Sequence, residues 1–245
     1  NGIGLASALA VLADESVEHG PLEVLLTMTE EAGMDGAFGL QPNWLQGEIL
    51  INTDSETEGE IYMGCAGGVD FITTQPLQRE ALHAGFTTLT LTLKGLKGGH
   101  SGADIHLGLG NANKLMARFL CVHGEEFGVR VLDLNGGTLR NAIPREAIAH
   151  LAVPTEKFAG FKAAVAAFLD TVTFALSAVE KNIEFVVEAT ANDGKVLTKE
   201  SQARFLGLLN ATPNGVLRMS DDVKGVVETS LNVGVVTMNE NEAQI

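Results

Sequence analysis

The run TTLTLTLK at residues 87–94 constrains the fold of this 245-residue chain more than any other stretch. Polar and apolar side chains alternate with a period of two, which places the leucines on one face of a β-strand and the threonines on the other. A strand with one apolar and one polar face is typical of an antiparallel sheet whose second face contacts solvent. We therefore expect such a sheet in this part of the chain.

The chain beyond residue 67 contains further helical and strand patterns. Helices are expected at residues 109–123, 156–180 and 198–209, and strands at residues 129–134, 147–153, 183–187, 215–218 and 226–238. We interpret residues 68–245 as an α+β domain, with a mostly antiparallel sheet and helices packed on one face. The glycine pair Gly67-Gly68 permits a hinge, so we place the domain boundary near residue 67.

Residues 1–67 show a different pattern. Small apolar residues at 2–14 predict a buried helix, and uninterrupted apolar runs predict covered strands at 23–29 and 48–52, with a short helix at 32–40 between them. An alternation of strand, helix and strand indicates an α/β unit with parallel strands. In such units, functional residues gather at the carboxyl ends of the strands.

Three carboxylates follow the two expected parallel strands. Glu30 and Glu31 end the first strand and Asp54 ends the second. Adjacent residues at a strand end point in different directions, which suits one carboxylate that binds a cation and another that transfers a proton. Carboxylates that share an apolar cleft repel one another unless a cation lies between them, and oxygen ligands together with histidine favour zinc or manganese.

Other interpretations of these carboxylates exist. A glutamate pair at a helix start complements the helix dipole, and an aspartate at a strand end often caps a turn. An EF-hand calcium loop beginning at Asp54 has the right first six positions, but its twelfth position is Cys65, where a bidentate glutamate is needed. The metal site and the capping roles remain open on the residues alone, whereas the EF-hand is excluded.

Composition narrows the class of protein. The formal net charge of −15 argues against a nucleic-acid partner, and the 45% hydrophobic content with a mean hydropathy of +0.17 is typical of a globular protein. No apolar run approaches the roughly 20 residues that are needed to cross a bilayer, so no membrane partner is expected. Two cysteines, Cys65 and Cys121, are too few for a disulfide framework and are expected to be buried thiols, which fits a cytoplasmic protein.

Six motifs in order along the chain resemble a known family. They are NGIG at 1–4, TMTEEAGMDGA at 27–37, INTDSE at 51–56, CAGG at 65–68, LKGLKGGHSG at 93–102 and LNGGTLRNAIPREA at 134–147. Together they resemble the aminoacyl-histidine dipeptidases, also called peptidase D or cytosolic non-specific dipeptidases. These are di-zinc peptidases, grouped with carnosinases and aminoacylases, and the resemblance covers essentially the whole chain.

The resemblance implies roles for five residues. Glu30 resembles the catalytic general base, while Glu31 and Asp54 resemble ligands of the two zinc ions, with manganese or cobalt as possible replacements. His100 resembles a histidine that polarises the scissile carbonyl, and Asn141 resembles a residue that holds the substrate. Without the resemblance, His100 is more simply an ordinary loop histidine between turn glycines. The family's remaining ligands, a His-x-Asp motif, a bridging aspartate and a last histidine, are expected outside residues 1–245.

The same resemblance implies a domain plan and a function. Residues 1–67 are expected to be part of the metallopeptidase catalytic domain, and residues 68–245 a lid and dimerisation domain. The full-length protein is expected to be a cytoplasmic, homodimeric, zinc-dependent dipeptidase that acts on unblocked dipeptides with a C-terminal histidine, using metal-activated water. The alternatives are an N-acyl amino acid deacylase or carboxypeptidase of the same clan, or a non-catalytic dimerisation module. Residues 1–245 alone are expected to be inactive.

Overall fold

The computed structural model describes residues 1–30, 33–54, 57–191 and 194–245. They form two compact units, Asn1–Cys65 and Ala66–Ile245. The assignment of the first to a catalytic domain and of the second to a lid remains a prediction.

The first unit contains two helices. α1 spans Gly2–Ala13, as expected, and begins where the Asn1 side chain accepts a hydrogen bond of 2.8 Å from the Gly4 amide. α2 spans only Asp35–Phe38, so it is shorter than the helix predicted at 32–40.

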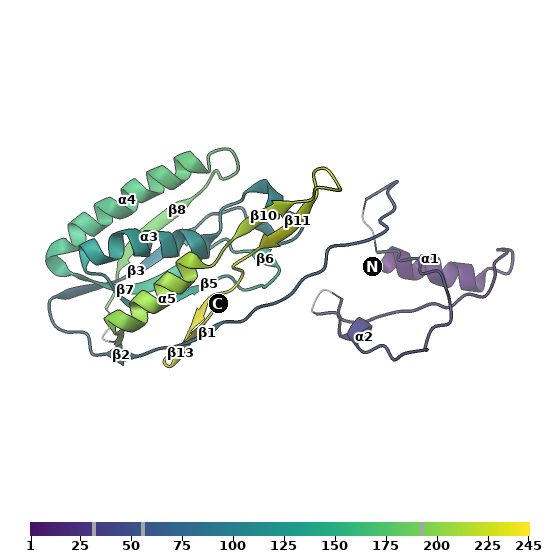
Figure 1. Ribbon diagram of the computed structural model, residues 1–245, viewed down its shortest axis with the longest axis horizontal. Coiled ribbons are helices and arrows are strands. Elements are labelled where there is room, and N and C mark those ends of the chain that lie inside the picture. Colours follow the sequence, from purple (N-terminus) through teal and green to yellow (C-terminus); the bar gives the residue numbers. More distant parts are fainter. Residues whose placement is uncertain (31–32, 55–56, 192–193) are drawn as a thin grey trace. The chain divides into compact units, whose positions relative to one another are not determined.

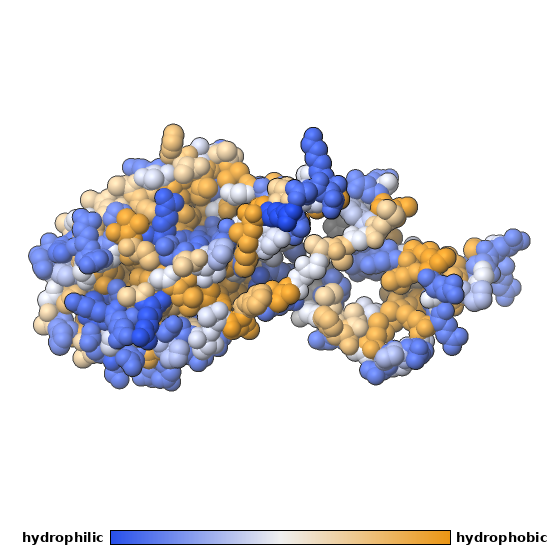
Figure 2. Space-filling view, viewed as in Figure 1, coloured by the Kyte–Doolittle hydropathy of each residue, from blue (hydrophilic) through white to orange (hydrophobic). Residues whose placement is uncertain are grey.

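The two strands predicted at 23–29 and 48–52 do not form. Neither segment pairs with another strand among the described residues, and a strand needs a partner to satisfy its backbone amides and carbonyls. Their apolar side chains are also uncovered, since Ile49 is 85% exposed and Leu26 is 58% exposed. Figure 2 shows such apolar side chains at the surface of this unit. The predicted parallel sheet is therefore absent from the described part of residues 1–65.

The second unit is built on a four-stranded sheet. β3 (Phe86–Lys94), β5 (Arg130–Gly136), β7 (Ala147–Pro154) and β8 (Glu184–Ala189) lie in the order β5-β7-β3-β8, and all neighbours are antiparallel. α3 (Ala112–Phe127), α4 (Phe158–Ala175) and α5 (Lys199–Ala211) lie over one face of this sheet (Figure 1). The predicted mixture of helices with a mostly antiparallel sheet is confirmed.

Smaller elements surround the sheet. They are the three-stranded β1 (Thr74–Pro76), β13 (Glu242–Gln244) and β12 (Thr237–Met238), the pairs β2 (Arg79–Glu80) with β9 (Val196–Leu197), β4 (Gly99–His100) with β6 (Ala142–Ile143), and β10 (Gly215–Met219) with β11 (Val227–Leu231), and the 3-10 turns η1 (Ile105–Leu107) and η2 (Thr155–Lys157). The strand predicted at 226–238 is thus divided between β11 and β12, and the helix predicted at 156–180 ends at Ala175.

The alternation of leucine and threonine at residues 87–94 accounts for part of the core of the second unit. Leu89, Leu91 and Leu93 of β3 are at most 1% exposed and lie in the main hydrophobic cluster, whereas the intervening threonines are only partly buried. Phe119 of α3 lies within 5.1–5.6 Å, centroid to centroid, of the rings of Phe161, Phe168 and Phe185. Burial of these aromatic and leucine side chains is the dominant stabilising contribution.

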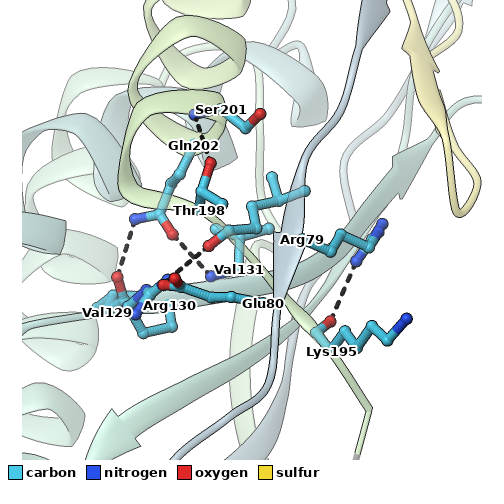
Figure 3. Close-up of polar contacts among 10 residues, drawn as sticks. Arg79, Glu80, Val129, Arg130, Val131, Lys195, Thr198, Ser201 and Gln202 are labelled. Atoms are coloured by element: carbon cyan, nitrogen blue, oxygen red, sulfur yellow. Dashed lines mark hydrogen bonds and ion pairs between the residues drawn. The ribbon is translucent and has the colours of Figure 1, made fainter.

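Side-chain hydrogen bonds join α5 and β2 to the sheet (Figure 3). The Gln202 side chain accepts from the Val131 amide at 2.9 Å and donates to the Val129 carbonyl at 2.8 Å. The Arg130 guanidinium donates to the Glu80 carboxylate, and this hydrogen bond lowers the pKa of Glu80. Because Glu80 lies in β2, these contacts fix the chain where it enters the sheet.

The expectation that the two cysteines are buried is wrong, whereas the expectation of no membrane partner stays a prediction. Among the described residues, the helical segment Thr155–Ala175 is long and apolar enough to cross a membrane by length and composition alone, although it includes charged residues. Here Phe161, Val165 and Phe168 from that helix pack into the core of the second unit. The cysteines Cys65 and Cys121 are exposed rather than buried.

Candidate functional site

A short two-stranded sheet brings His100 and Asn141 together. β4 and β6 pair antiparallel, with His100 opposite Ala142, and the Ser101 amide donates a 2.8 Å hydrogen bond to the Asn141 carbonyl. The two residues are 41 positions apart in the sequence, and both side chains are exposed. The pairing of β4 with β6 thus places the backbone segments that carry His100 and Asn141 next to one another.

The imidazole of His100 is held in a defined orientation. Its Nδ1 accepts hydrogen bonds from the amides of Gly102 and Ala103, at 3.0 and 3.1 Å. An Nδ1 that accepts two amide hydrogens carries no proton of its own, so the neutral ring has its proton on Nε2. His100 therefore presents an N–H donor on the side of the ring that faces away from the turn.

The backbone around His100 is fixed as well. The Asp104 carboxylate accepts from the His100 amide at 2.8 Å, and the Asp104 amide donates to the His100 carbonyl at 3.0 Å. Gly98 has a φ of +66°, and a Cβ at this position would lie 2.4 Å from Cγ of Arg145. The turn needs glycine there because other residues adopt this φ only with strain and because the stem of Arg145 occupies the space.

A network of asparagine side chains binds β6, the second strand of this small sheet. Asn232 donates to the Ala142 carbonyl at 2.8 Å, and Asn111, which caps α3, donates to Asn232 at 3.3 Å and to Asn214 at 2.8 Å. Sequence reasoning missed these three residues. Only the capping position of Asn111 before a helix gave a local signal, since the partners are more than 100 residues away.

A groove of about 680 Å³ lies beside β6. It is lined by residues 94–96, 135–139 and 142–148, which include Leu139 and Ala142 on either side of Asn141. Its charged side chains are Lys94, Arg145 and Glu146. The groove can therefore accept a small molecule that carries both polar and charged groups.

The predicted carboxylates lie in the other unit. Glu30 and Asp54 are exposed, and Glu31 lies outside the described residues. No group of three or more His, Cys, Asp or Glu side chains that could hold a metal ion occurs among the residues that the structure describes. The described part of the chain does not fit a metal centre by itself, and the predicted meeting of Glu30, Glu31 and Asp54 stays a prediction.

Comparison with known proteins gives three findings. Residues 91–180 match the peptidase dimerisation domain of the M20 peptidases. The whole chain is 65% identical to the cytosol non-specific dipeptidase of Escherichia coli strain K12 and covers 50% of that protein. It also matches the crystal structure of an aminoacylhistidine dipeptidase from Vibrio alginolyticus, with a TM-score of 0.84 and 55% identity, over 100% of this chain and 50% of that one. The chain thus spans about half the length of the relatives that it matches.

Proposed function

We propose that the full-length protein is a dipeptidase, because the chain is similar over all of its residues to two dipeptidases, in agreement with the sequence motifs. The observation that carries this proposal is the 65% identity to a cytosol non-specific dipeptidase over all 245 residues of this chain. The proposed substrates are unblocked dipeptides, with histidine as the preferred C-terminal residue. The name of that relative also supports a cytoplasmic location.

The second unit contributes substrate contacts in this proposal. The Nε2–H of His100 donates a hydrogen bond to the scissile carbonyl oxygen and stabilises the negative charge that develops there. The hydrogen bonds from Gly102 and Ala103 to Nδ1 support this role, because they keep the proton on the outward nitrogen. Asn141 holds the substrate from the neighbouring loop, across the pairing of β4 with β6.

The first unit contributes acid–base chemistry and metal ligands in this proposal. Glu30 accepts a proton from the attacking water and passes it to the departing amine. Glu31 and Asp54 are two ligands of a zinc site whose other ligands come from residues beyond these 245. Bound zinc supplies a water of lowered pKa when the site is complete.

The second unit also supports the proposal of a homodimer. β8 lies at one edge of the central sheet and pairs with β3 alone among the described strands. The outer side of an edge strand offers backbone donors and acceptors to another chain. In addition, residues 91–180 match a peptidase dimerisation domain. Sedimentation of residues 1–245 at increasing concentration tests this. A dimer is expected, and a monomer at high concentration would count against it.

Two measurements test the catalytic proposal in the full-length protein. Hydrolysis of free dipeptides is expected to exceed hydrolysis of N-acyl amino acids, and the reverse preference would favour the deacylase of the same clan instead.

Glu30→Ala is expected to abolish turnover while zinc stays bound. Glu18→Ala, which changes an exposed glutamate of the same unit, serves as the control and should leave turnover intact. Full activity of Glu30→Ala would remove Glu30 from the proton-transfer role.

A further inference from the structure

Glu180 is a buried acidic residue beyond the end of α4, with only 2% of its surface exposed. Its Oε2 accepts a 2.8 Å hydrogen bond from the Lys97 amide, and its Oε1 accepts a 2.9 Å hydrogen bond from the Gly110 amide. One carboxylate therefore binds two backbone amides that lie 13 residues apart in the sequence.

The two amides flank one segment of the chain, residues 98–109. Residues 98–109 lie between the end of β3 at Lys94 and the start of α3 at Ala112, and they contain the His100 turn, Asp104 and η1. Gly110 lies very close to its surroundings, because a Cβ there would be 2.7 Å from Leu96 and 3.4 Å from Oε1 of Glu180. Glu180 thus joins the beginning and the end of the segment that carries His100.

Burial of a carboxylate is costly, and apolar side chains would fill the same space without that cost. Among the described residues, Glu180 is the only charged residue that is buried. Both of its oxygens bind amides rather than a cationic side chain, so its described contacts serve the backbone of residues 97 and 110. A buried carboxylate that is hydrogen-bonded at both oxygens holds these two backbone segments in one specific conformation.

We propose that Glu180 is a positioning residue for His100. By binding the amides of Lys97 and Gly110, it fixes both ends of segment 98–109. The contacts of Asp104 and Gly102 inside this segment then orient the imidazole. The inference rests on the proposed function, because it requires that His100 contacts the substrate. Glu180 itself touches no reacting atom.

The test is a double-mutant cycle in the full-length protein with an unblocked dipeptide as substrate. In Glu180→Gln, the side chain keeps one oxygen acceptor but turns an NH₂ group towards the second amide, so one hydrogen bond is lost. Misplacement of a substrate-contacting group by about 1 Å costs about 100-fold in rate, so we expect kcat to fall about 10- to 100-fold. KM should change much less, because the substrate keeps its other contacts. Glu125→Gln, at an exposed glutamate on α3, is the matched control and should retain wild-type kcat.

The cycle separates positioning from general stability. In a His100→Ala background, Glu180→Gln should lower kcat less than about twofold further, because the group that it positions is gone. An equal fall in both backgrounds would show a purely structural role and overturn the inference. Normal kcat in Glu180→Gln, together with low kcat in His100→Ala, would overturn the inference and leave the proposed function standing. Normal kcat in His100→Ala would overturn both.

A second variant covers the case in which Glu180→Gln does not fold. In Gly110→Ala, the added methyl group would lie 2.7 Å from Leu96, which is only 2% exposed and has little room to move, so we expect the Gly110 amide to shift while the carboxylate is unaltered. Gly110→Ala should lower kcat in the wild-type background as Glu180→Gln does. In the His100→Ala background it should lower kcat little further. Wild-type kcat in a folded Gly110→Ala protein would contradict the inference.

Discussion

Gly137 begins the loop between β5 and Asn141, and its replacement by alanine tests how that loop is built. Gly137 has a φ of +72°, and a Cβ there would lie 1.9 Å from the carbonyl oxygen of Gly234. The left-handed conformation costs an alanine about 1–2 kcal/mol. The collision is with backbone, so it is relieved only by moving the chain, and comparable overpacking costs about 1–3 kcal/mol. Gly137→Ala should therefore lower the free energy of unfolding by about 2–5 kcal/mol.

Gly85→Ala is the matched control. Gly85 also has a positive φ, +96°, but no atom lies within 4 Å of the position that a Cβ would take. Alanine reduces the entropy of the unfolded chain in the same way at both positions, so that effect cancels in the comparison. Gly137→Ala should be the less stable of the two variants by about 1–3 kcal/mol, which is the cost of the collision alone.

The assay is urea denaturation followed by circular dichroism at a helical wavelength. Fluorescence is unsuitable because the single tryptophan, Trp44, lies in the first unit, whereas α3, α4 and α5 lie in the second. Equal losses for Gly137→Ala and Gly85→Ala would refute the argument, since backbone contact with Gly234 would then contribute nothing.

Three further predictions concern the second unit. Phe119→Ala should lower its free energy of unfolding by about 3–5 kcal/mol in the same assay, because it leaves a cavity among three phenylalanine rings; a loss below about 1 kcal/mol would contradict the packing. Lys114 donates to the carbonyls of Leu209, Asn210 and Thr212 at the end of α5, so Lys114→Met should cost about 1–2 kcal/mol, whereas Lys224→Met at an exposed lysine should cost little. Burial raises the pKa of Asp133 above 3.8, so its contribution to stability is present below pH 3.8 and is lost as pH rises through the folded pKa. Asp133→Asn should therefore gain stability relative to the wild type from pH 4 to pH 8, and a constant or falling difference would refute this.

The regular elements of the second unit were predictable because their patterns are local. The alternation of leucine and threonine at 87–94 corresponds to β3, and the helices over 112–127 and 199–211 lie close to their predicted positions. Each pattern depends on neighbours within one or two turns or strand positions. The two strands predicted in the first unit failed for the opposite reason, since a strand depends on a partner that its own residues do not specify.

The candidate site was predictable only in part. The motifs pointed to His100 and Asn141, but nothing local predicts that β4 and β6, of two residues each, pair with one another. The bond between Asn111 and Asn232 spans 121 residues, and the bond from Lys97 to Glu180 spans 83, so neither has a sequence pattern. Such contacts depend on the tertiary fold, which places distant loops together.

The role of His100 is decided by kcat of the full-length His100→Ala protein on an unblocked dipeptide, with zinc content determined on the same sample. We expect kcat to fall about 100- to 1,000-fold, the usual effect of removing one donor to a developing oxyanion, with unchanged zinc content. Wild-type kcat in that protein would contradict the claim that the second unit supplies His100 to the reaction.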